Sequence, residues 1–182
     1  LATNNNILAT NILIGDSTGG ITPLTSRITL GRGSNYVDTP TLTVGARKHP
    51  SILTLPAGGT LVLTNSASGR TDFIVCSNGT STGSTPACTA DLSGGPFIAN
   101  LGNLTLGLKN SGGTGGATGT LTLATNSANA VDVNDVTLGT MAGAPSGSTT
   151  AASGTLNFSA GSFKVNNNLT LGSVDVPGFG TA

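Results

Sequence analysis

The stretch of residues 101–140 constrains the fold most, because its apolar residues alternate with small or polar ones. Leucine occupies every second position in residues 104–108 and again in residues 121–123. Side chains of a β-strand point to opposite faces with a period of two, so each run predicts a strand with one leucine face. Residues 111–119, between them, are too rich in glycine for regular structure. We therefore expect a hairpin whose leucines face a core.

Composition extends this expectation to the whole chain. None of the 182 residues is Glu, Gln or Trp, and only 8% are charged. The residues that usually cover helix surfaces are thus scarce, whereas Thr and Val favour strands, and Gly and Asn favour turns. We predict an all-β protein. Further strands are predicted at residues 26–30, 41–44, 51–55, 60–64 and 72–75.

The spacing of these strands favours a β-sandwich, Ig-like or jelly-roll-like, with residues 16–182 as a single domain. The alternative is a right-handed parallel β-solenoid. A solenoid should repeat with a fixed period, and the LTL-like segments are irregularly spaced, which favours the sandwich. These segments begin near residues 28, 42, 53, 61, 104, 121, 136, 155 and 169.

Residues 1–15 are predicted to form an N-terminal strand with two apolar faces. A strand of this kind is poorly suited to an exposed edge. One interpretation is a first strand buried in its own sheet; the other is a donor strand that is exchanged between subunits and completes a neighbour's sheet. The residues predicted to make that polymerisation contact are Ile7, Leu8, Ile12, Leu13 and Ile14.

Cys76 and Cys88 frame a polar loop, SNGTSTGSTPA. In a secreted chain this pattern predicts a local disulfide, worth roughly 3 kcal/mol for so short a loop. A metal centre is not expected, because the single histidine, His49, is distant in sequence and a third soft ligand is lacking. Four Asn-x-Ser/Thr triplets are candidate glycosylation sites, the best being in the polar loop. They begin at Asn78, Asn103, Asn157 and Asn168.

The sequence contains no pattern typical of an enzyme or of a cofactor site. Nucleophile elbows, phosphate loops and paired glutamates are absent. Asp132, Asn134 and Asp135 could offer oxygens to calcium, but the glycine and distal glutamate of a calcium loop are missing. We interpret them as polar residues at a strand edge, and we predict that the protein is not an enzyme.

Charge and hydropathy limit the partners. The net charge is zero, which argues against nucleic acid, and no apolar run is long enough to span a membrane. Residues 1–70 carry a net charge of +3 and residues 71–182 a net charge of −3, which suits a head-to-tail polymer. We expect an extracellular or cell-surface chain, either a mature secreted protein or a fragment of a longer one.

Residues 104–158 resemble the immunoglobulin-like repeat modules of bacterial and archaeal surface and filament proteins. In those modules a strand ends in an Asn-x-Gly turn, here residues 110–112, and a second strand, a short strand and a small-residue loop follow. The resemblance implies a β-sandwich in a surface fibre or stalk. Residues 154–173, GTLNFSAGSFKVNNNLTLGS, look instead like units of autotransporter-like adhesin passengers, which stack as a β-solenoid.

The leading functional hypothesis is a pilin-like structural subunit of an extracellular filament or surface fibre. Its partner would be a second copy of itself, joined by strand addition or head-to-tail contacts. The alternative is a cell-surface adhesin or carbohydrate-binding module with surface glycans as partners. That alternative ranks second because Tyr36 is the only tyrosine and tryptophan is absent. A solenoid polysaccharide lyase ranks third, because acid, base and calcium ligands are few.

Overall fold

The computed structural model describes residues 1–17, 24–79, 84–110, 115–125, 128–142 and 152–175. Within them the chain is all-β, and each hydrogen-bonded strand pair is parallel. These described residues include no helix that is long and apolar enough to cross a membrane. The strands are β1 Asn5–Leu8, β2 Ile12–Ser17, β3 Ser26–Thr29, β4 Ser34–Asp38, β5 Thr41–Arg47, β6 Ser51–Thr54, β7 Thr60–Thr64, β8 Thr71–Asn78, β9 Ala87–Leu92, β10 Phe97–Lys109, β11 Ala117–Leu123, β12 Ala130–Ala142, β13 Ala152–Asn157 and β14 Ser162–Asp175.

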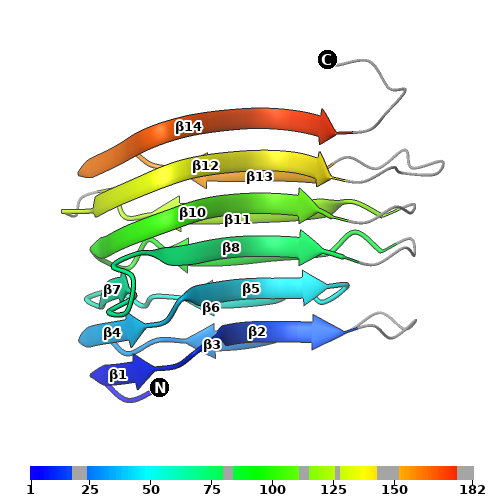
Figure 1. The fold of residues 1–182 in the computed structure, drawn as a ribbon. Helices are drawn as coiled ribbons and strands as arrows, with labels where there is room; N and C mark the ends of the chain where they lie inside the picture. The colour runs from blue at the N-terminus through cyan, green and yellow to red at the C-terminus, as the bar shows by residue number, and fades with distance from the viewer. Residues whose placement is uncertain (18–23, 80–83, 111–114, 126–127, 143–151, 176–182) are drawn as a thin grey trace.

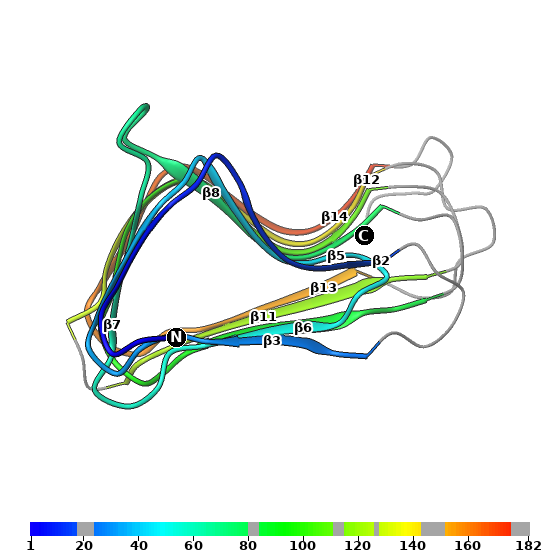
Figure 2. The same ribbon diagram turned by 90° about the horizontal axis from the view of Figure 1, so that it is seen from below.

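The strands wind into a β-solenoid of about 5 turns (Figure 1). Each of the first three coils holds three short strands, β1 to β3, β4 to β6 and β7 to β9, around a roughly triangular cross-section (Figure 2). In later coils one long strand, β10, β12 or β14, takes the place of the first two strands. A larger sheet thus forms two sides of the triangle, and β3, β6, β9, β11 and β13 form the third.

The predicted sandwich is therefore wrong, and with it the likeness to immunoglobulin-like modules. The expected hairpin does not form, because β10 lies in the larger sheet and β11 in the smaller one. Each therefore pairs with the equivalent strand of the next coil, about thirty residues away, and not with its sequence neighbour. The N-terminal residues form two short strands that complete the chain's own sheet, since β1 pairs with β4 and β2 with β5.

The interior consists of columns of apolar side chains that run along the solenoid axis. A single coil cannot cover its own apolar face, and stacking the coils produces one continuous core. Phe73 and Phe97 make an edge-to-face contact in this core, with their ring centroids 6.0 Å apart. Strand pairing defines one column as Ile14, Val44, Val75, Leu106, Leu138 and Leu171. A second column is Ile12, Leu42, Phe73, Leu104, Val136 and Leu169.

A third column, which we call the left-handed column, shapes every coil. Its members sit at equivalent positions of the larger sheet, and each has a positive φ, between 59° and 80°. Glycine is the residue that tolerates this conformation, and five of the six members are glycine. They recur at intervals of 30 to 33 residues, the true repeat of the chain. The left-handed column is Gly15, Gly45, Cys76, Gly107, Gly139 and Gly172.

Buried asparagines hold the corners between coils. The fully buried Asn35 side chain donates to the carbonyls of Gly31 and Thr60 and accepts from the Gly31 backbone N–H at 2.8 Å. Asn129 acts in the same way, accepting from the Phe97 N–H at 3.1 Å and donating to two carbonyls. Such bonds satisfy backbone groups at corners that the sheets leave unpaired.

Candidate functional site

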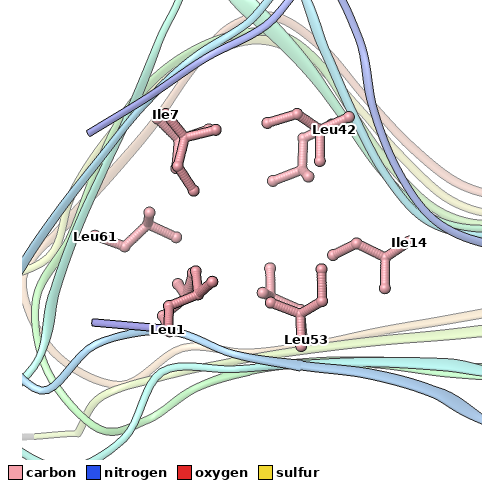
Figure 3. A pocket seen from close by; sticks show the side chains of 10 residues that line it. Leu1, Ile7, Ile14, Leu42, Leu53 and Leu61 are labelled. Carbon is pink, nitrogen blue, oxygen red and sulfur yellow. The ribbon is translucent and has the colours of Figure 1, made fainter. Parts of the chain in front are cut away.

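The two ends of the solenoid are the candidate site. At the N-terminal end the interior contains an apolar cavity of about 200 Å³ lined only by aliphatic side chains (Figure 3). It lies within the first coils, because its walls come from β1, β2 and β3 together with strands of the next two coils. Those labelled in Figure 3 are Leu1, Ile7, Ile14, Leu42, Leu53 and Leu61.

The five residues predicted to make a polymerisation contact lie on opposite faces of strands β1 and β2. Ile7, Ile12 and Ile14 point inward and line the cavity. Leu8 and Leu13 point outward, with 68% and 43% of their surface exposed. The predicted single strand is divided into β1 and β2, so Leu8 lies on the opposite face from Ile12 and Ile14. Both faces carry apolar side chains, and the inward face packs on the chain's own later coils.

At the opposite end, β14 is the last described strand of the larger sheet and pairs only with β12. Leu169 and Leu171 continue the inward columns but remain 57% and 65% exposed, because no further described coil covers them. Phe158, which follows β13 of the smaller sheet, is 38% exposed, and its ring contacts the Phe163 ring at a tilt of 51°, with ring centroids 5.6 Å apart. Within the described residues, this end therefore presents an apolar interior and a strand edge without a partner.

Polar side chains form a ridge on the outer corner of the later coils. Arg70 pairs with Asp132 at 2.6 Å, and Asn166 and Lys164 also approach that carboxylate. The hydrogen bond from Arg70 lowers the pKa of Asp132, and hydrogen bonds from Asn168 and Asn167 lower the pKa of Asp135. Arg70 and Lys164 thus both lie next to the Asp132 carboxylate. The described part of the chain contains no group of three or more His, Cys, Asp or Glu residues able to hold a metal ion.

The candidate glycosylation sites differ in accessibility. Asn78 is fully buried, and its side-chain amide donates to the carbonyls of Ser84 and Gly116, so a glycan cannot be attached there in the folded chain. The other three asparagines are exposed and bond to neighbouring coils. Asn103 contacts Asp72, Asn157 contacts Thr122, and Asn168 contacts Asp135. For these three, glycosylation stays a prediction.

Cys76 and Cys88 are buried free thiols in the structure and are not at bonding distance for a disulfide. They lie on β8 and β9, in different sheets of the same coil. Of the loop between them, residues 80–83 lie outside the described residues. Both side chains are buried in the interior of the third coil.

Sequence reasoning missed the left-handed column and the corner asparagines. A signal for the column exists, since an apolar residue precedes the glycine or cysteine in ILIG, TVG, IVC, LTLG, VTLG and LTLG. Comparisons with protein-family models, curated proteins and solved structures find no match to this chain.

Proposed function

We propose that this chain is a structural subunit of an extracellular filament or surface fibre, assembled by head-to-tail stacking of solenoids. In this arrangement β14 of one copy pairs in parallel with β1 and β2 of the next. The observation that carries the proposal is that both ends belong to the same side-chain columns. Leu171 and Ile14 end one column, and Leu169 and Ile12 end another.

The match between the two ends extends to the side of the triangle that β1, β4 and β7 form. Phe163 of β14 is equivalent to Ile7 of β1 through the intervening strands, so in-register stacking places an aromatic ring over the N-terminal cavity. The contact is heterologous, because one end meets the other. In a solenoid whose coils stack by translation such a contact does not close into a ring, and an open fibre results.

Unpaired edges supply the backbone part of the interaction. β14 is a strand of 14 residues, and β1 and β2 together offer a matching edge. Parallel pairing would satisfy exposed N–H and C=O groups, at a net gain of about 1 kcal/mol for each hydrogen bond. Burying Leu169 and Leu171 would add about 1–2 kcal/mol each. Together these terms can offset an association cost on the order of 4–15 kcal/mol.

Analytical ultracentrifugation and electron microscopy of the purified chain test the proposal. We expect concentration-dependent oligomers and unbranched fibres about as wide as one solenoid. A chain that stays monomeric at high concentration would overturn it. Leu171→Asp places a charge in the contact and should block assembly. Ile98→Asp is the matched control, because Ile98 is also exposed, at 42%, but points outward from the middle of the solenoid.

A second candidate function, a carbohydrate-binding face of an adhesin, is favoured by the outer face of the smaller sheet. Thr89, Thr120 and Thr155 stack in register across β9, β11 and β13, about 4.8 Å apart. Hydroxyls at a regular spacing on a flat sheet suit a repeating polysaccharide. Binding of the chain to an insoluble polysaccharide, and its loss in Thr120→Glu, would support this function. Unchanged binding in that variant would contradict it.

A further inference from the structure

The two sheets approach each other closely along the left-handed column. In the fourth coil Gly107 faces Gly119, and a Cβ atom on Gly119 would lie only 2.5 Å from the Gly107 backbone nitrogen. In the fifth coil Gly139 faces Gly154 with a similar clearance of 2.7 Å. At these two levels the gap between the sheets therefore leaves no room for a side chain on Gly119 or Gly154.

Both cysteines of the chain occupy the equivalent positions of the third coil. Cys76 takes the place of glycine in the left-handed column, with a φ of 67°. This conformation costs a residue other than glycine about 1–2 kcal/mol. Cys88 lies opposite Gly119 in the adjacent strand of the smaller sheet. The chain thus places its only two cysteines face to face, and holds one of them in a conformation that favours glycine.

The surroundings keep both thiols inside and next to each other. Cys76 is 0% exposed and its Sγ donates to the Pro86 carbonyl at 3.2 Å, while Cys88 is 1% exposed. A hydrogen bond between the two thiols raises the pKa of Cys76 and lowers the pKa of Cys88.

The structure holds Cys76 and Cys88 as free thiols that are not at bonding distance. We propose that on oxidation they form a disulfide across the interior, which ties the larger sheet to the smaller one from within. The inference is independent of the filament function. The oxidant is a disulfide donor, either a small molecule such as oxidised glutathione or a protein. One of the two cysteine thiolates attacks a donor sulfur and expels the first donor thiol. The other cysteine thiolate then attacks the cysteine sulfur of this mixed disulfide and expels the second donor thiol. Two cysteine thiols lose their protons, one S–S bond forms, and the donor S–S bond is reduced.

Burial determines when the bond forms and how it behaves afterwards. A donor cannot reach either sulfur once the coil is closed, so the disulfide forms while the third coil folds. After folding, the same burial shields the bond from reductants. This distinguishes an interior bond from a disulfide at the base of an exposed loop.

The test uses the full chain, refolded in a glutathione redox buffer and alkylated with N-ethylmaleimide in denaturant. We expect no adduct and an intact mass lower than that of the reduced chain by two hydrogen atoms. Two adducts per chain would overturn the proposal. The second measurement is reduction by dithiothreitol, which should be at least tenfold slower in native buffer than in guanidinium. Equal reduction rates would show that the bond is not interior.

The variant Cys76→Gly supplies the control, because glycine is the usual residue of this column. It should fold, carry one adduct on Cys88 and retain its unfolding temperature in both redox states. The unfolding temperature of the parent chain should be several degrees higher when oxidised than when reduced. If oxidation leaves it unchanged, the disulfide does not tie the sheets together.

Discussion

Ile14, in the first coil, and Leu171, in the last described strand, are the terminal members of one inward column, connected by the register of four strands between them. Ile14 is 4% exposed and lines the N-terminal cavity, whereas Leu171 is 65% exposed. The two ends of the solenoid are therefore alike in pattern but differ in how completely the column is covered.

Replacing Leu171 with Asp should weaken self-association at least tenfold. In the proposed contact, burial of the Leu171 side chain contributes about 1.5 kcal/mol, and the substitution would place a charge there instead. Sedimentation equilibrium measures the dissociation constant. Ile98→Asp should leave it unchanged. Equal association of the two variants would contradict the stacking arrangement.

Deleting residues 1–15 separates stacking from strand donation. The deletion removes β1 and most of β2, and the new edge is then β4 and β5, which carry the inward column members Val37, Leu42 and Val44. Stacking predicts that the truncated chain still assembles, since the columns continue at the new edge. Electron microscopy would detect this, and folded monomers would instead favour residues 1–15 as a donor strand.

Gly107→Ala should destabilise the fold more than Gly172→Ala. Both glycines belong to the left-handed column, with φ of 71° and 59°, so alanine costs about 1–2 kcal/mol in conformation at either position. A Cβ on Gly107 would also overlap the Ser153 carbonyl, whereas Gly172 has no atom within 4 Å of that position. Overlap adds about 1–3 kcal/mol. Urea unfolding measures the difference, and equal losses would contradict the close approach of the sheets.

Asn35→Ala should lower the free energy of unfolding by about 2–4 kcal/mol. The substitution leaves the buried Gly31 backbone groups and the Thr60 carbonyl without their side-chain partner. Asn157→Ala is the control, because the exposed Asn157 makes a single bond to Thr122, and it should change stability by less than about 0.5 kcal/mol. Denaturant titration of the three proteins tests whether corner asparagines hold the coils together.

Asp132 should make stability depend on acid pH. Its pKa in the folded chain lies below the usual value, because the ionised carboxylate accepts a hydrogen bond from Arg70. The stabilisation is complete above the unfolded pKa of about 3.9 and is lost as pH falls through the lower folded pKa. Unfolding midpoints between pH 2 and 6 should therefore fall less steeply for Asp132→Asn than for the parent chain. Parallel curves would show that the Arg70 contact does not stabilise the fold.

Strand positions were largely predictable from the sequence, because alternation with a period of two is a local property. Residues 60–64, predicted from alternation, coincide with β7, and residues 26–30, 51–55 and 72–75 overlap β3, β6 and β8. Pairing was not predictable in the same way. Adjacent strands were expected to form a hairpin, but β10 pairs with β7 and β8 of the preceding coil and with β12 of the next one, and not with β11.

The repeat was missed for a related reason. The LTL-like segments lie on different sides of the triangular cross-section. A list of their starting positions therefore combines several separate repeats, and the common period does not show. The series that begins at residue 42 in β5 continues at residues 104, 136 and 169, and strand pairing places these positions in one column with Phe73 of β8. The repeat within that one column is close to regular.

The sequence by itself determined that the chain is built of strands, that its charge is low and that its N-terminal segment is apolar on both faces. Only the tertiary structure decided that the strands are parallel, that Cys76 faces Cys88, and that the two ends share the same columns. The physical reason is that alternation specifies which face of a strand is apolar, whereas partner choice depends on how whole coils cover one another. That covering is a property of contacts about thirty residues apart.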